Sequence, residues 1–97
     1  MPNSENPSSK RILIIDDEEH FAQVLSRSLN RIGHETRYAL TQDEAIQLAK
    51  QQTFDWISLD LRLGQESGLK LISEIKLLQP QASIVILTGF ASIPTAV

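Results

Sequence analysis

The stretch FDWISLDLRL, Phe54 to Leu63, has the pattern of a buried β-strand that ends on a carboxylate, Asp60. Most residues before Asp60 are apolar, with Phe54 and Trp56 expected in the core, and Gly64 follows as a breaker. A parallel strand covered by helices on both faces needs such a run, because neither face meets water. In an open α/β sheet the carboxyl ends of the strands form the ligand crevice, so Asp60 is expected there. An Asp that merely starts a turn is the simpler alternative.

The composition narrows the classes of protein that this sequence can encode. Its 97 residues suffice for one small domain and not for two. A net charge of −3 without a basic patch argues against nucleic-acid binding by this segment. The absence of cysteine excludes disulfides, thiolate metal sites and cysteine catalysis. No apolar run approaches the roughly 20 residues of a membrane span, and residues 1–9 lack a signal-peptide core, so we expect a cytoplasmic protein without membrane contact.

Strands and helices are expected to alternate along the chain. Residues 1–9, rich in Pro, Ser and Asn, are predicted to be a disordered leader. Strands are predicted at 12–15, at 35–39 near an edge, at the stretch ending on Asp60, and at 83–87. Gly33 is expected to end the first helix, Thr41 and Glu44 to form a capping box on the second, and Pro80 to end the third. The pattern predicts an α/β, doubly wound parallel sheet of order 2-1-3-4.

Apolar side chains at helical spacing mark the faces that these helices should bury. The residues expected on the buried faces are Phe21, Val24, Leu25, Leu29 and Ile32 in the first helix, Ala45, Ile46, Leu48 and Ala49 in the second, and Leu71, Ile72, Ile75 and Leu78 in the third. Beyond the fourth strand, Ser92 looks like the N-cap of a further helix, with Pro94 in its first turn.

Polar groups lie at the carboxyl ends of three of the predicted strands. Asp16 and Asp17 follow the first strand, Asp60 ends the third, and Thr88 follows the fourth. In the order 2-1-3-4 these strands are neighbours, so the groups should converge. Three like charges repel one another, and a hard cation held by oxygen ligands would offset that repulsion. The sequence therefore predicts a Mg²⁺ site and phosphoryl chemistry, with a carboxylate as nucleophile or only as metal ligand.

Each of these residues also has a purely structural interpretation. Asp17 alone is as well explained as a helix N-cap, and Thr88 alone as a β-branched strand end. Ser67 is interpreted as a helix cap, and His20 and His34 as surface residues without metal-ligand spacing. The convergence of several polar groups at one edge is what these interpretations leave unexplained.

Four segments of the sequence resemble the receiver domain of bacterial response regulators, which has a flavodoxin-like fold. They are ILIIDDEE (Ile12 to Glu19), DWISLDLRL (Asp55 to Leu63), SGL (Ser67 to Leu69) and IVILTGFAS (Ile84 to Ser92). The resemblance implies that Asp60 accepts a phosphoryl group from a sensor histidine kinase and that Thr88 hydrogen-bonds this group and switches. It also implies that Asp16, Asp17, Asp60 and the backbone carbonyl of Arg62 hold Mg²⁺. The protein would then be no enzyme, beyond assisting its own phosphorylation and dephosphorylation.

The amino-acid sequence of these motifs further resembles that of the RegA/PrrA/ActR group, which joins a receiver to a DNA-binding output domain. By this resemblance, residues 10–97 form an incomplete receiver that lacks the fifth strand, its Lys, the fifth helix and the output domain. The fourth strand, Ser83 to Leu87, should then be an exposed edge that promotes self-association, directly or by exchange of the C-terminal segment. Phosphorylation should be slow, because no Lys of this chain is placed to replace the missing one.

Two other functions remain open. A non-catalytic, receiver-like dimerisation module fits the missing Lys but not the intact acidic trio. A Mg²⁺-dependent phosphohydrolase with an Asp nucleophile usually carries a second Asp two residues later, and here Arg62 follows Asp60 and Glu18 follows Asp16 at that distance.

Overall fold

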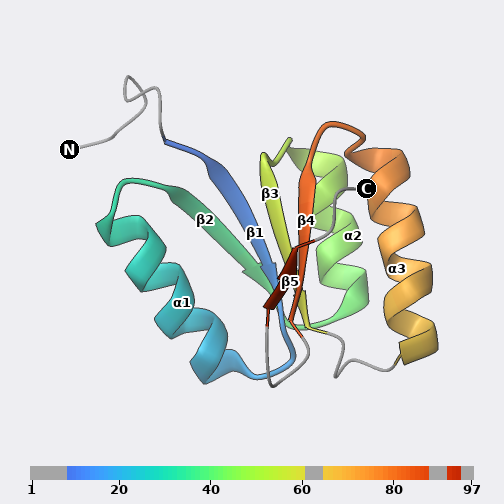
Figure 1. Cartoon of the computed structure of the whole chain (residues 1–97), viewed down its shortest axis with the longest axis horizontal. Helices are drawn as coiled ribbons and strands as arrows, with labels where there is room; N and C mark the ends of the chain where they lie inside the picture. Colours follow the sequence, from blue (N-terminus) through green and yellow to red (C-terminus); the bar gives the residue numbers. More distant parts are fainter. Residues whose placement is uncertain (1–8, 61–64, 88–91, 95–97) are drawn as a thin grey trace.

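A parallel sheet in the predicted order β2-β1-β3-β4 forms the centre of the protein, and a short strand, β5, extends it (Figure 1). The computed structural model describes residues 9–60, 65–87 and 92–94. In chain order the elements are β1 (Arg11–Ile15), α1 (Glu19–Arg31), β2 (Glu35–Ala39), α2 (Gln42–Gln51), β3 (Trp56–Asp60), α3 (Gln65–Leu78), β4 (Ser83–Leu87) and β5 (Ser92–Pro94).

The two faces of the sheet are covered by different helices, α1 on one side and α2 with α3 on the other (Figure 1). On the α2 and α3 side, Leu13 of β1 and Ile57 of β3 pack with buried residues of both helices, among them Ala45 and Leu71. On the α1 side, a smaller cluster joins Ile12 and Ile14 to Ala22. Strand β1 lies between β2 and β3 and under helices on both faces, which is why its run of Ile and Leu is completely buried.

Helix α1 buries less of its apolar face than the spacing predicts. Leu25 and Leu29 pack on the sheet as expected, but Phe21 is 38% exposed and Ile32 is 68% exposed. The prediction that Trp56 lies in the core is also wrong, since it is 44% exposed. The physical reason is the position of α1: its hydrogen bonds run to Tyr38 and Thr36 of β2, so the helix lies toward that border of the sheet and leaves its other flank uncovered.

Two further side chains depart from their predicted burial. Val24 of α1 is exposed because it lies on the flank of the helix that faces away from β2. Leu78, the last residue of α3, is 37% exposed because the next residue, Gln79, occupies the buried position at this end of the helix. The predicted cap at Ser67 is also wrong, since α3 begins at Gln65 and includes this residue.

The ends of α1 and α2 follow the local signals in the sequence. Gly33 has a φ of 104°, and the two hydrogen bonds Gly33 N to Asn30 O and His34 N to Leu29 O close the end of α1 as a Schellman motif. At the start of α2, the Glu44 amide donates to Thr41 Oγ1 and the Glu44 carboxylate accepts from Leu40 N. The predicted N-cap at Thr41 is therefore confirmed, and Glu44 reaches back as predicted, although its partner is the amide one residue before the N-cap.

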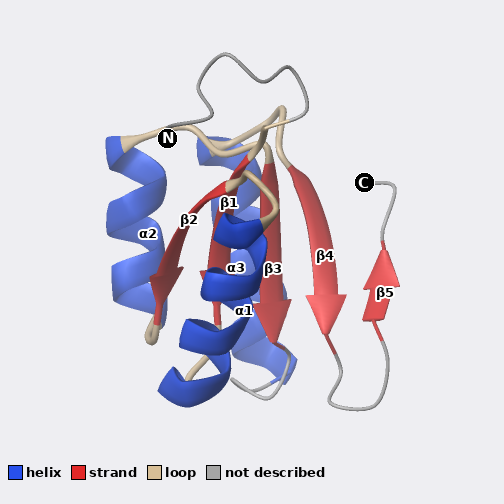
Figure 2. Cartoon of the chain, turned by 90° about the vertical axis from the view of Figure 1, so that its left-hand side faces the viewer, coloured by secondary structure: helices blue, strands red, loops and turns tan. Residues whose placement is uncertain are grey.

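The segment after β4 differs from its prediction. Residues Ser92–Pro94 form strand β5, antiparallel to β4, in place of the predicted start of a helix. The pairs Val85 with Pro94 and Leu87 with Ser92 cover most of the β4 border that was expected to be exposed. Local capping signals cannot foresee this, because a free strand edge offers hydrogen bonds that a three-residue helical start lacks. Figure 2 shows β2 at one border of the sheet and β5 at the other.

Candidate functional site

Asp16 is held at the carboxyl end of β1 by its own backbone and side chain. Its amide donates to Ala39 O at the end of β2, which extends the sheet by one bond. Its Oδ1 accepts from Glu18 N at 2.8 Å and so shapes the turn into α1. The side chain is 1% exposed. A buried carboxylate at this point is costly unless its oxygens are bonded, so the turn accounts for part of its placement.

Asp17 and Asp60 complete an acidic cluster with Asp16. Asp60 is the last residue of β3 and is 2% exposed, whereas Asp17 is exposed. One carboxylate oxygen from each of the three lies within 4.8 Å of the others. The predicted convergence is therefore present, because β1 and β3 are adjacent parallel strands whose carboxyl ends meet at one edge.

The helix-cap interpretation of Asp17 is not supported by the geometry. The residue at the N-cap of α1 is Glu18, and it makes no capping bond with its side chain. The bond to the turn comes from Asp16, a role that the sequence analysis missed, although the i to i+2 spacing of Asp16 and Glu18 is typical of an Asx turn. Asp17 is thus left with a carboxylate that faces the cluster and solvent.

Two predicted site residues, Arg62 and Thr88, lie outside the described residues, as does most of the predicted leader. Leu87, the last described residue of β4, pairs with Asp60 across the sheet. His20 is exposed as predicted. His34 is not a plain surface residue, because it is partly buried and its Nδ1 accepts from Lys10 N at 3.0 Å.

The donor set of the cluster suits a hard divalent cation. Carboxylate oxygens are the ligands that Mg²⁺ and Ca²⁺ prefer, and three negative charges within a few ångströms favour a bound cation. Two of the donor residues are buried and one is exposed, so a cation bound by them would still be accessible to waters or phosphate oxygens from the solvent. The residues present therefore fit Mg²⁺.

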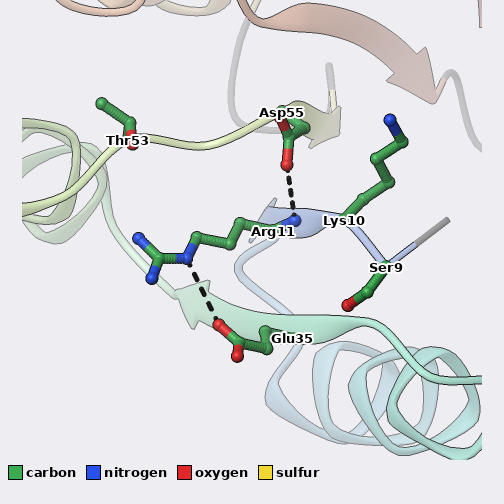
Figure 3. Close-up of a pocket in the computed structure, with 6 residues that line it drawn as sticks. All are labelled: Ser9, Lys10, Arg11, Glu35, Thr53 and Asp55. Carbon is green, nitrogen blue, oxygen red and sulfur yellow. Dashed lines mark hydrogen bonds and ion pairs between the residues drawn. The ribbon is translucent and has the colours of Figure 1, made fainter. Parts of the chain in front are cut away.

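A pocket of about 320 Å³ lies at the opposite, amino-terminal edge of the strands (Figure 3). Several of its polar residues have a structural role, because they form hydrogen bonds between the starts of the strands. Arg11 N donates to Asp55 Oδ2 at 2.9 Å, and Arg11 Nε donates to Glu35 Oε1 at 3.3 Å. These bonds tie the starts of β1, β2 and β3 together. Among the described residues, the acidic cluster is therefore the better candidate for chemistry.

The fold and the cluster together define a class: a doubly wound α/β domain that gathers carboxylates at the switch point of its sheet. The family model of the response regulator receiver domain matches residues 12–97. This chain belongs to that family. In the described part of the chain, none of the helices has the length and apolarity needed to cross a membrane.

Two relatives support the assignment. The photosynthetic apparatus regulatory protein RegA of Rhodobacter capsulatus is 31% identical over 90 residues, which are 93% of this chain and 49% of RegA. The response regulator protein PilR of Pseudomonas aeruginosa is 34% identical over 90 residues, which are 93% of this chain and 20% of PilR. The chain thus spans between a fifth and a half of these relatives, and the expected similarity to RegA is confirmed for this segment.

A solved structure matches both fold and sequence. The crystal structure of a response regulator protein from Burkholderia pseudomallei superposes with a TM-score of 0.79 at 48% identity, over 86% of this chain and 49% of that chain. That structure contains a phosphorylated aspartic acid, a calcium ion and citrate.

Proposed function

We propose that this segment accepts a phosphoryl group on Asp60 in a Mg²⁺-dependent step and thereby acts as the switch of a two-component system. The observation that carries the proposal is the convergence of the three carboxylates at the end of β3. Membership in the receiver family and the phosphorylated aspartic acid of the Burkholderia relative support it. The phosphoryl donor is a phosphohistidine of a sensor kinase, and the output is a DNA-binding domain in the whole protein.

The three carboxylates have different roles in this proposal. An oxygen of Asp60 attacks phosphorus, a P–O bond forms, the bond from phosphorus to the donor breaks, and the donor leaves with that electron pair. Asp16, Asp17 and Asp60 would hold the metal, and the backbone carbonyl of Arg62 is proposed as a further ligand. Bound Mg²⁺ would neutralise charge that gathers on the phosphoryl oxygens. Thr88 is proposed to hydrogen-bond the phosphoryl group and signal its presence.

Acetyl phosphate separates this function from the two alternatives. The chain is incubated with acetyl phosphate and Mg²⁺, and its intact mass and the release of inorganic phosphate are followed. A slow gain of one phosphoryl group without continued turnover is the expected result. Continued release of phosphate would instead indicate a phosphohydrolase, and neither signal would favour a non-catalytic dimerisation module.

Mg²⁺ alone should stabilise the fold through the acidic cluster. At a Mg²⁺ concentration ten times its Kd, the free energy of unfolding should rise by about 1.4 kcal/mol. Asp17→Ala should abolish this rise, because it removes the exposed ligand, whereas Asp43→Ala on α2 should keep it. Thermal melts with and without Mg²⁺ provide the measurement, and the fluorescence of Trp56 on β3 can follow unfolding. If Asp17→Ala is stabilised as strongly as the parent, the assigned ligand is wrong.

We also propose self-association by exchange of the C-terminal segment. Strand β5 has three residues, and it can form the same pairs with β4 of a second copy. The exposed Trp56 and Phe21 add apolar surface that a second copy can bury. Light scattering should give a mass that rises from one chain toward two as concentration increases. A single-chain mass at every concentration would rule this association out.

A further inference from the structure

We infer that the free border of β2 binds an extended peptide of a partner protein that carries a large apolar residue with a basic residue two positions away. The inference does not depend on the acidic cluster, which lies at the carboxyl ends of the strands. It follows from three features of the same place: unused backbone groups, an apolar recess and a carboxylate rim.

The unused backbone groups belong to Thr36 and Tyr38. Glu35 N donates to Lys10 O, and Ala39 O accepts from Asp16 N, so both residues turn their backbone toward β1. Successive residues of a parallel strand point their N–H and C=O groups to alternate sides, so those of Thr36 and Tyr38 point outward. Among the described residues, none of the hydrogen bonds uses these groups. Strand β2 has β1 as its neighbour on one side and forms the border of the sheet on the other.

An apolar recess opens beside this border, between β2 and α2. Its volume is about 470 Å³, and it is lined by Tyr38 and Leu40 at the end of the strand and by residues of α2 that include Leu48. Tyr38 belongs to β2, Leu40 follows it and Leu48 belongs to α2, so the recess lies beside the carboxyl end of β2. An added strand would lie about 4.8 Å from β2, and its alternate side chains would point toward α2 and into this recess.

The rim of the recess gives the peptide its charge preference. Asp43 and Glu44, in the first turn of α2, line the same recess and are exposed. One carboxylate oxygen of Glu44 accepts from Leu40 N. Leu40 is the next residue after Tyr38 whose N–H points away from β1, so this N–H is not available to the peptide. A Lys or Arg two residues from the apolar residue, on the side of this turn of α2, would meet these carboxylates, since residues two apart share a face of a strand. The site therefore has the parts of β-strand addition: main-chain bonds for affinity and a pocket for selectivity.

A direct test uses the peptide acetyl-Lys-Val-Leu-Val-Lys-amide and amide hydrogen exchange of the 97-residue chain. In the free protein, the amides of Thr36 and Tyr38 should exchange faster than those of Glu35 and Arg37, which face β1. Peptide at a concentration of about 1 mM should slow exchange at Thr36 and Tyr38. A Kd of about 1 mM is the weakest affinity that we count as binding. Glu35 and Arg37 should change little, and this alternation is the signature of an added strand.

Matched controls separate backbone bonds from charge. The same peptide with N-methyl groups on its three inner residues should bind at least about tenfold more weakly, because it loses main-chain donors toward β2 and its methyl groups crowd the strand edge. Asp43→Lys should weaken binding about three- to fivefold, whereas Glu74→Lys, with the same change of charge on α3, should stay within about twofold.

The inference would be overturned by absence of binding at the highest peptide concentration, by equal binding of the N-methylated peptide, or by protection of residues elsewhere in the chain. Protection of Thr36 and Tyr38 in the free protein that grows with protein concentration would show that a second copy occupies the edge, and the proposed occupant would then be wrong.

Discussion

Replacing Asp60 by Asn should abolish phosphorylation while leaving the fold intact. The amide of Asn fills the same space as the carboxylate but is not a nucleophile, and removing one of three crowded negative charges relieves repulsion. Loss of a nucleophile costs on the order of 10⁶ in rate in a well-studied protease, so we expect at least about a hundredfold loss here. The measurement is the gain in intact mass with acetyl phosphate and Mg²⁺, with the modified residue located by peptide mapping.

Two controls distinguish the acceptor from its neighbours. Asp55→Asn makes the same chemical change just before β3 and should leave phosphorylation unchanged. Asp17→Asn keeps the acceptor and weakens the metal site, so the chain should be phosphorylated more slowly but still at Asp60. An Asp60→Asn chain that still gains one phosphoryl group as fast as the parent would place the acceptor elsewhere and refute the proposed function.

Replacing Gln79 by Leu should cause a large loss of stability. Gln79 follows α3, is 4% exposed, and its side-chain amide makes three hydrogen bonds. It accepts from Phe54 N at 2.9 Å and donates to Ala49 O and Gln52 O, both at 2.8 Å. One side chain thus joins the end of α2, the start of β3 and the end of α3. Leu would leave a buried amide and two carbonyls without partners.

The expected cost is about 3 kcal/mol, since each buried polar group left unpaired costs roughly 1–3 kcal/mol and the apolar side chain returns part of it. For a domain of this size the midpoint of thermal unfolding should fall by about 15 °C. Urea denaturation of Gln79→Leu and of Gln81→Leu provides the measurement. Gln81 is exposed, so its replacement should change the free energy of unfolding little. Equal effects of the two substitutions would show that the hydrogen bonds of the buried Gln79 amide do not contribute measurably to the free energy of unfolding.

Local patterns in the sequence were enough to predict the order β2-β1-β3-β4 and the acidic cluster. The run from Ile12 to Ile15 is completely apolar because both faces of β1 are covered, and such a short apolar run before two Asp residues is typical of a central parallel strand. Once parallel neighbours are assigned, their carboxyl ends must meet, so Asp16, Asp17 and Asp60 converge without any knowledge of side-chain packing. The ends of α1 and α2 were equally predictable, since a Schellman glycine and a capping box act over a few residues.

The tertiary structure alone decided what depends on relative position. An apolar face at helical spacing does not reveal how far a helix is displaced across a sheet, so the exposure of Phe21 and Trp56 was not predictable. A Gln after a helix resembles any surface residue, and only the approach of the end of α2 and of the residues just before β3 gives Gln79 its three partners. Likewise, Ser92 to Pro94 carries a helix-start signal, yet the unpaired border of β4 supplies hydrogen bonds that turn it into β5. In each case the deciding partner is distant in sequence, and a local pattern contains no information about it.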